Sequence, residues 1–340
     1  MRNKRKTIIG LVVSALFLVL IFYNVDFKEL VATFKQFEFK NLAVIAGMYA
    51  FSLLVRSVRW QFLLQCDKKY SLYRLSSAWV IGNLMNAILP ARAGDIWRAY
   101  EVGNSVKESK MKLFGSVMLE RIFDGVSICV ILYFCIMTYA NLSWIRQFAD
   151  LSLVLFGGSL IVFYLVVRFD KTDMICGFFI DLAKKTPEKF ADKLTKFVER
   201  ICCQVKNFVG GFAALKSTYY TFQAVLMSFG AWILEILVTY LVINSFGINC
   251  KFSASMFVIC FIALGSMIPS SSVFVGPYQY AYILALGIYF IPKSEALAIA
   301  FVHQSILMGV LLLLSAVFVL INFLLRIKKP AADAYFKHSQ

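Results

Sequence analysis

The sequence of 340 residues has few histidines, few prolines and few acidic residues. Its two histidines are His303 and His338, and its eight cysteines are scattered without a C-x-x-C pair. This inventory excludes a histidine-based metal centre and disfavours a structural zinc site or a disulfide framework. No P-loop or comparable nucleotide-binding signature occurs. We therefore expect no metal and no cofactor.

Polar residues are also scarce, which excludes an ordinary soluble protein. Apolar residues make up 60% of the chain and the mean hydropathy is +0.75, whereas soluble domains are about 45–50% apolar. The net charge of +16 lies mostly in short stretches between long apolar runs, as in a polytopic membrane protein with basic cytoplasmic loops. We expect membrane lipids as partners and no nucleic acid.

The apolar runs predict an all-α integral membrane protein with about six full transmembrane helices and two broken re-entrant hairpins. The full spans are expected at residues 7–23, 42–64, 113–139, 151–168, 219–246 and 295–325, each long enough to cross about 30 Å of hydrocarbon. The first run resembles a signal peptide, but no small-residue cleavage site follows it, so we expect a retained span.

Two further apolar regions, 75–103 and 254–290, are broken near their middles. Broken helices of this kind are tolerated only inside protein or beside a wet cavity. The expected breaks are at Pro90, Gly94, Pro269, Gly276 and Pro277.

The distribution of basic residues predicts the orientation. With both termini placed inside, the cytoplasmic segments hold 25 Lys and Arg residues and the exterior holds six. This bias predicts a multi-pass protein of a prokaryotic plasma membrane with a cytoplasmic tail at 326–340.

The order span, broken hairpin, span occurs twice within one polytopic membrane domain. It covers 42–139 and then 219–325, which predicts two inverted repeats whose hairpin tips meet near the midplane. Two coincidental helix kinks are the alternative. Residues 140–218 would connect the repeats through one span and a polar amphipathic segment, 171–209, that either packs on the bundle or lies on anionic headgroups.

Eight ionisable residues fall within the apolar regions. Each would cost roughly 2.5–3.5 kcal/mol alone at the bilayer centre, so they must pair or face water. Arg56 and Arg59 share one helix face, and Glu120 and Asp124 share another. The other four are Arg92, Asp95, Arg121 and Glu235. An Arg–carboxylate network is expected, either as a structural clamp or as part of a substrate site.

The first hairpin tip is the candidate headgroup site. Arg92 and Asp95 lie beside the break, with amide groups nearby, and an Arg fork can bind a phosphate bidentately. The alternative is that these residues only maintain the fold. The substrate-binding candidates are Arg56, Arg59, Asn83, Asn86, Arg92, Asp95 and Arg98, with Ser270, Ser271, Ser272 and Tyr278 from the second hairpin.

Other polar residues are candidates for a charge network or for coupling to an ion. Glu235 lies near the middle of its span and could be the counter-ion of Arg92, a proton site or a partner for a cationic headgroup. His303 and Gln304, in the last span, could hydrogen-bond across helices or relay protons. The full set is Glu120, Arg121, Asp124, Glu235, His303 and Gln304.

Four sequence segments together resemble the lysylphosphatidylglycerol synthase transmembrane region, also called the flippase-like domain family. They are RSVRW (56–60), GNLMNAILPARAGDIWR (82–98), MLERIFDG (118–125) and IPSSSVFVGPYQ (268–279). Asp95 stands where the family commonly has Glu. The resemblance implies a protein that moves a phosphate-bearing lipid, aminoacylated or polyprenyl-linked, between leaflets, without the soluble aminoacyltransferase domain of longer relatives.

Three functions therefore compete. The first is a lipid flippase or scramblase and not an enzyme. The second is a membrane transferase acting on lipid headgroups, with Glu120 and Asp124 as its acid/base groups. The third is a non-transporting partner of a separate lipid synthase. A homo-oligomer is an open alternative in each case.

Overall fold

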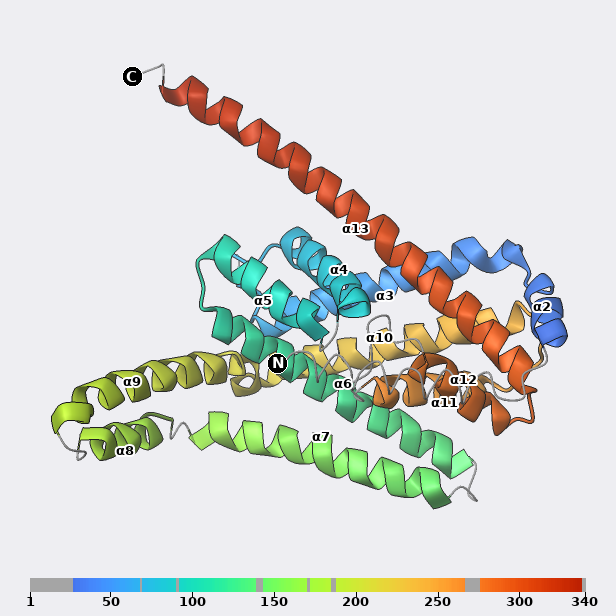
Figure 1. The fold of residues 1–340 in the computed structure, drawn as a ribbon, viewed down its shortest axis with the longest axis horizontal. Helices are drawn as coiled ribbons and strands as arrows, with labels where there is room; N and C mark the ends of the chain where they lie inside the picture. The colour runs from blue at the N-terminus through green and yellow to red at the C-terminus, as the bar shows by residue number, and fades with distance from the viewer. Residues whose placement is uncertain are drawn as a thin grey trace.

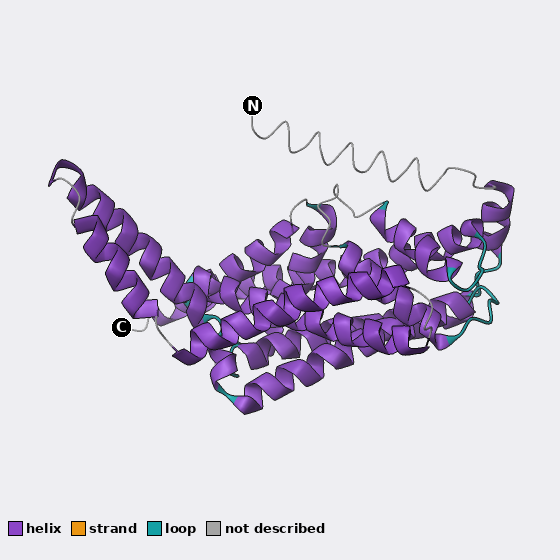
Figure 2. Ribbon diagram, turned by 90° about the horizontal axis from the view of Figure 1, so that it is seen from below, coloured by secondary structure: helices purple, strands orange, loops and turns teal. Residues whose placement is uncertain are grey.

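A computed structural model describes residues 27–67, 69–89, 92–138, 143–169, 172–184, 188–266 and 276–337 of the chain. Within these ranges every regular element is a helix and no strand occurs (Figure 2). The expected span at 7–23 lies outside the described residues, as do Pro90, Pro269 and the serines Ser270, Ser271 and Ser272.

The prediction of an all-α membrane protein is confirmed. Four segments of the described chain are long and apolar enough to cross a membrane: Phe39–Leu63, Ile145–Phe169, Thr218–Asn244 and Lys293–Leu325. They correspond to α3 (Leu42–Leu63), α7 (Ser143–Phe169), α10 (Thr218–Asn244) and the first part of α13 (Lys293–Lys337). A further helix, α6 (Lys110–Thr138), has 29 residues but carries charged side chains.

Both predicted hairpins are pairs of short helices with a break between them. The first consists of α4 (Leu72–Ile88) and α5 (Ala93–Val106), and the second of α11 (Phe252–Gly265) and α12 (Pro277–Gly287). The N-caps have positive φ angles, 52° at Arg92 and 105° at Gly276, so the chain turns sharply into each second helix. Pro277 follows at the first helical position, where its missing N–H costs nothing.

Gly94 does not break the helix, contrary to the sequence-based expectation. It lies in the first turn of α5, where α5 crosses α4 at Gly82. A Cβ atom at residue 94 would lie 1.8 Å from the carbonyl oxygen of Gly82. Glycine is therefore required here for close backbone approach and not for a helix break.

Helices α3 and α10 form an antiparallel pair at the centre of the bundle (Figure 1). The start of α3 meets the end of α10, where the Glu38 N–H donates to the Ser245 carbonyl at 2.8 Å. The end of α3 meets the start of α10, where Gln65 Nε2 donates to the Ala213 carbonyl at 3.0 Å. The two predicted repeats therefore meet along this pair.

The polar segment 171–209 is two helices, α8 (Thr172–Lys184) and α9 (Glu188–Gly210), which pack on one another. The sequence predicted a single amphipathic segment here, and the structure divides it into two helices. The remaining elements are α2 (Phe27–Lys35) and two short 3-10 helices, η1 (Phe39–Asn41) and η3 (Ala213–Lys216). Helix α13 continues to Lys337, through most of the expected tail.

The two ends of the first hairpin are tied together outside the spans. Lys69, just before α4, donates a hydrogen bond to Glu108, which follows α5. This ammonium group holds the pKa of Glu108 well below its ordinary value, at about 2. Tyr70 also donates to Glu108, at 3.4 Å. The clamp fixes where the hairpin enters and leaves the bundle.

Replacing Gly94 by Ala should destabilise the protein, because the new methyl group collides with backbone that cannot move aside. The expected cost is about 1–3 kcal/mol, as for overpacking of a well-packed core. Gly230→Ala in α10 is the matched control, since nothing lies within 4 Å of its added Cβ. Thermal unfolding of both variants in detergent would test this, and equal midpoints would show that the α4–α5 crossing does not need glycine.

Candidate functional site

Nine ionisable side chains form one cluster inside the bundle. Four helices supply them: Arg56 and Arg59 from α3, Asp95 and Arg98 from α5, Glu120, Arg121 and Asp124 from α6, and Glu235 from α10, with Arg92 at the N-cap of α5. Arg59 and Glu120 are fully buried. Arg98, which the sequence-based charge balance assigned to the cytoplasm, is 1% exposed and belongs to the cluster. The balance is therefore five arginines to four carboxylates.

Bidentate pairs hold α5 against α6. Arg121 donates from Nε and Nη2 to the two oxygens of Asp95, at 3.1 and 2.9 Å. Arg98 donates from Nη1 and Nη2 to the two oxygens of Glu120, both at 3.1 Å. Asn86 completes the shell of Asp95, with its amide nitrogen 3.1 Å from Oδ1 and its amide oxygen accepting from the Asp95 N–H at 3.1 Å. Paired, planar contacts of this kind are strong and geometrically specific.

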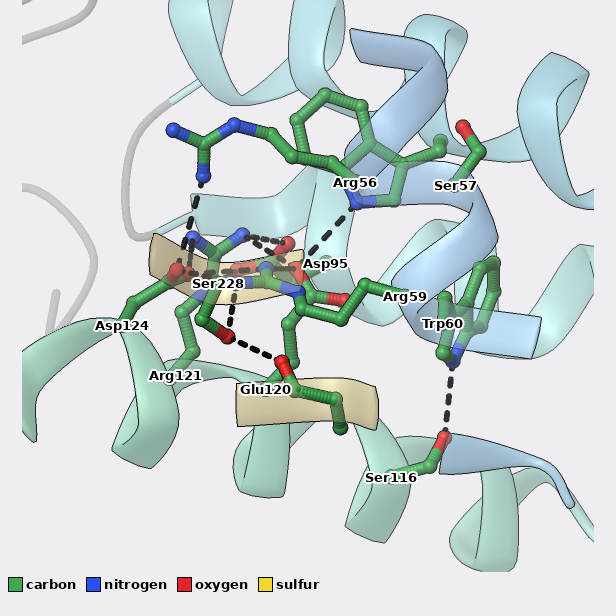
Figure 3. Close-up of polar contacts among 12 residues, drawn as sticks. Arg56, Ser57, Arg59, Trp60, Asp95, Ser116, Glu120, Arg121, Asp124 and Ser228 are labelled. Atoms are coloured by element: carbon green, nitrogen blue, oxygen red, sulfur yellow. Dashed lines mark hydrogen bonds and ion pairs between the residues drawn. The ribbon is translucent and has the colours of Figure 1, made fainter. Parts of the chain in front are cut away.

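Arg59 joins α3 to the same carboxylates. Its Nη1 and Nη2 donate to Asp124, the second at 3.2 Å, and Nη2 lies 3.0 Å from Glu120 Oε1. It also donates to Ser228 Oγ of α10 at 3.0 Å. Figure 3 shows the Arg59 guanidinium between these partners. The predicted Arg–carboxylate network is present, and Arg59 and Arg98 both have their terminal nitrogens engaged.

Glu235 is paired with Arg56 and not with Arg92. Arg56 Nη2 donates to Glu235 Oε1 at 3.3 Å, and its Nη1 lies 3.7 Å from Asp124 Oδ1. The guanidinium also stacks over the Trp232 ring at 4.6 Å. Of the three roles considered for Glu235, the structure disfavours that of counter-ion to Arg92.

Three tryptophans support the cluster, and sequence reasoning missed all of them. Trp232 Nε1 donates to Asp124 at 3.1 Å, and Trp79 Nε1 donates to Glu120 at 3.3 Å. Trp60 lies under the Arg98 guanidinium at 4.9 Å and donates to Ser116 at 3.0 Å. Tryptophan prefers membrane interfaces, so the place of Trp232 near the middle of α10 was the available signal of a buried acceptor.

Arg92 differs from the other four arginines. Its Nη2 donates to Ser266 at the end of α11, with 2.7 Å to Oγ and 3.4 Å to the carbonyl oxygen. Among the described residues it forms no ion pair with a carboxylate. Its contact joins the tips of the two hairpins, as the sequence predicted. Arg92 is therefore the arginine of the cluster whose charge no carboxylate of the described chain neutralises.

The second hairpin forms a neutral centre with α13. The Tyr278 hydroxyl lies 3.0 Å from His303 Nδ1, and the Tyr282 hydroxyl also contacts this atom. Gln279 Nε2 donates to Gln304 Oε1 at 2.6 Å. His303 and Gln304 thus hydrogen-bond across helices, whereas their coupling role stays a prediction. Tyr278 faces this centre rather than Arg92.

The ionic and neutral centres occupy equivalent positions in the two repeats. Asp95 and Arg98 lie 184 residues before Gln279 and Tyr282, while Glu120 and Arg121 lie 183 residues before His303 and Gln304. The contact Asp95–Arg121 therefore corresponds to Gln279–Gln304, and Arg98–Glu120 corresponds to Tyr282–His303. Where the first repeat uses ions, the second uses neutral hydrogen-bonding groups.

The α3–α10 pair follows the same symmetry. With an offset of 176 residues, Arg59 corresponds to Glu235, and Ser52 corresponds to Ser228. The bond from Arg59 to Ser228 is accordingly matched by a bond from Ser52 to Glu235 at 3.5 Å. Arg56 and Trp232, also 176 apart, contact one another. These contacts follow the two-fold relation that an inverted repeat requires.

The family model for the lysylphosphatidylglycerol synthase TM region matches residues 7–315. The chain belongs to this family. The resemblance inferred from the sequence is therefore confirmed.

Three relatives extend the comparison. The chain is 25% identical over 252 residues to the UPF0104 membrane protein MJ1078 of Methanocaldococcus jannaschii, covering 74% of this chain and 99% of the relative. It is 26% identical over 302 residues to the UPF0104 membrane protein PH1989 of Pyrococcus horikoshii, covering 84% and 87%. It is 23% identical over 320 residues to the glycosyltransferase AglD of Haloferax volcanii, covering 88% of this chain and 51% of AglD. No solved structure matches the chain.

The remaining candidates divide into placed and unplaced residues. Asn86 contacts Asp95, whereas Asn83 makes no side-chain hydrogen bond with the described part of the chain. The three serines of the second tip, Ser270, Ser271 and Ser272, lie outside the described residues. No group of three or more potential metal ligands occurs among the described residues.

Replacing Glu120 by Gln should lower the free energy of unfolding by about 3–5 kcal/mol, because two buried arginines lose their shared carboxylate. Glu108→Gln, which affects a more exposed pair, should cost less than about 1 kcal/mol. Denaturant titration in detergent would measure both. Adding Arg98→Gln to Glu120→Gln should restore part of the loss, and strictly additive costs would show that the two residues are not coupled.

Replacing Gln304 by Leu should lower the free energy of unfolding by less than Glu120→Gln does. It leaves the buried Gln279 amide without its partner, which costs about 1–3 kcal/mol. The same denaturant titration gives the comparison. A loss as large as that of Glu120→Gln would contradict the assignment of the second centre as the weaker one.

Proposed function

We propose that this protein is a lipid transporter, a flippase or scramblase, that moves a phosphate-bearing lipid between the leaflets of a prokaryotic plasma membrane. The N- and C-termini would face the cytoplasm. Membership of the family, two broken hairpins with touching tips and a polar cluster inside the bundle support this proposal. Broken helices that meet inside the membrane commonly form transporter substrate sites.

Arg92 is the observation that carries the proposal. It lies at the junction of the two hairpins, half-buried, with a hydroxyl and a carbonyl group as its described partners. The other four arginines are each within 4 Å of at least one carboxylate oxygen. Within the described part of the chain only Nη2 of this guanidinium is engaged, and its other N–H groups would bind a phosphate. A phosphate oxygen would replace Ser266 as the partner of Arg92.

The charge balance favours a singly charged phosphate. With all nine groups ionised, five positive and four negative charges leave +1. A phosphodiester such as that of phosphatidylglycerol carries −1 and would make the occupied cluster neutral. A phosphate monoester carries about −1.5 to −2 near neutral pH and would leave a negative excess, which is costly in a low-dielectric site.

The second candidate function is a headgroup-modifying transferase. One relative, AglD, is named a glycosyltransferase, which is the reason to consider it. A general base needs an accessible lone pair within reach of its substrate. Glu120 is fully buried and accepts from Arg59, Arg98 and Trp79. Asp124 is held by Arg59 and Trp232. This engagement favours a structural role for both carboxylates over an acid/base role.

Leaflet exchange in proteoliposomes would test the proposal. The labelled lipids are phosphatidylglycerol, its lysyl form and a polyprenyl phosphate. We expect exchange of at least one of them, with the phosphodiester preferred over the monoester for the charge reason above. Arg92→Ala should reduce the rate by roughly tenfold or more, as expected for loss of a charge-assisted bond of about 1.5–3 kcal/mol.

Arg74→Ala is the matched control. Arg74 lies in the first turn of α4, at the other end of the same hairpin. Among the described residues its side chain bonds only to the Lys69 carbonyl, and its backbone N–H donates to Ser71. Its loss should leave exchange unchanged. Exchange no faster than in empty vesicles with every lipid, from folded protein, would contradict transport and favour the enzyme or the partner of a separate synthase.

A further inference from the structure

The helical hairpin α8–α9 follows span α7 directly, after two intervening residues (Figure 1). The helices are antiparallel, because Asp173 near the start of α8 pairs with Lys206 near the end of α9. Cys176 of α8 and Cys202 of α9 are buried against one another, and Cys202 Sγ lies 3.9 Å from the Cys176 carbonyl oxygen. Each helix thus has one face fixed by its partner.

A second face of α8 is apolar and uncovered. Phe178 and Met174 are each 65% exposed, and Ile175 is 53% exposed. Phe179 and Leu182 extend the same stripe at 49% and 52%. Spacings of one, three and four residues place all five on one side of the helix. Asp173 and Lys184 lie on the opposite side of α8, and Asp181 lies at the edge of the stripe.

Helix α9 carries a matching stripe. Its members are Leu194, Phe197, Ile201 and Val205, of which Phe197 is 60% exposed. Cys203 lies on the opposite face of α9, about half a turn from Ile201, and is exposed. The sequence left open whether this stripe packs on the bundle, and the exposure of its side chains shows that the described chain does not cover it.

The two stripes fall on the same side of the hairpin. Following the chain around each helix axis in the direction of increasing residue number, the stripe comes roughly a third of a turn before the face that packs on the partner. In an antiparallel pair this relation turns both stripes to one side. The hairpin therefore has a continuous apolar surface two helices wide.

The charge of the hairpin indicates what covers that surface. Residues 172–210 contain seven basic and five acidic side chains, a net charge of +2, and all seven basic ones lie between residues 184 and 206. The exposed Lys196 and Arg200 are neighbours of Phe197 along the helix. An apolar stripe bordered by basic residues is typical of helices that lie at an anionic membrane surface. The direct connection to α7 keeps the hairpin close to such a surface.

We propose that the apolar surface of α8–α9 inserts into the interface of a membrane leaflet that contains anionic lipids. The aromatic and aliphatic stripe would occupy the headgroup–acyl boundary, while Lys196 and Arg200 contact headgroups. This role is independent of the lipid-transport proposal, because it needs neither Arg92 nor the cluster. It makes the hairpin an anchor for the connection between the two repeats.

Nitroxide accessibility of the full-length protein in vesicles tests the proposal. Cys66 and Cys250 are replaced by Ser, and the buried cysteines are retained. Labels are placed at Phe178→Cys and Ile201→Cys, each with Cys203→Ser, and separately at the native Cys203. Collision rates with oxygen, which partitions into lipid, and with a water-soluble nickel chelate are compared in vesicles with and without phosphatidylglycerol.

The expected result is a higher oxygen-to-nickel ratio at both stripe positions than at Cys203 in vesicles with phosphatidylglycerol. In vesicles of phosphatidylcholine alone, the ratio at the stripe positions should fall toward that of Cys203. A low ratio at all three positions would overturn the proposal in favour of a solvated hairpin. Stripe labels shielded from both reagents would overturn it in favour of a protein partner or a second copy. A ratio independent of phosphatidylglycerol would overturn the anionic-lipid part.

Discussion

Compensation of charge inside an apolar bundle is the constraint on which the rest of this structure depends. Nine ionisable groups cannot remain in such a place without partners, because each unpaired charge costs several kcal/mol. The partners come from helices that are far apart in the sequence, and Arg59 alone contacts α6 and α10. Satisfying the charges therefore fixes how α3, α5, α6 and α10 pack. The glycine contact between α4 and α5 then sets how closely the first hairpin can fold.

Helix type and the break at Gly276-Pro277 could be predicted from the sequence, because both are local properties. Apolar length gives the spans, and Gly276-Pro277 can only turn the chain and start a helix. Partner choice could not be predicted, because spacing along one helix says nothing about which helix faces it. Arg98 shows this: the sequence-based charge balance counted it with the cytoplasmic residues, yet the pairing with Glu120 buries it. Gly94 was likewise predicted to break a helix, whereas it allows the close approach of α5 to Gly82 of α4.

The internal symmetry gives the two repeats the same layout with different chemistry. A bidentate Asp95–Arg121 pair in one repeat is a Gln279–Gln304 amide bond in the other, and Arg98–Glu120 is replaced by Tyr282–His303. Such pairs keep the geometry of the crossing while removing the charge. The total charge of the site is then set by the first repeat together with Glu235 of α10, and the +1 that remains is carried by Arg92, where the hairpin tips touch.

This difference determines which half of the bundle rearranges at lower cost. Separating α5 from α6 would expose or strand buried ions, at about 3–5 kcal/mol for each broken pair. Separating α12 from α13 breaks neutral hydrogen bonds, each with a net contribution of about 0.5–1.5 kcal/mol. The contact between the tips is a hydrogen bond from Arg92 to the uncharged Ser266. A phosphate bound to Arg92 would compete with Ser266 for this donor. Occupation of Arg92 would therefore release the second hairpin first, while the first hairpin stays fixed by its ions.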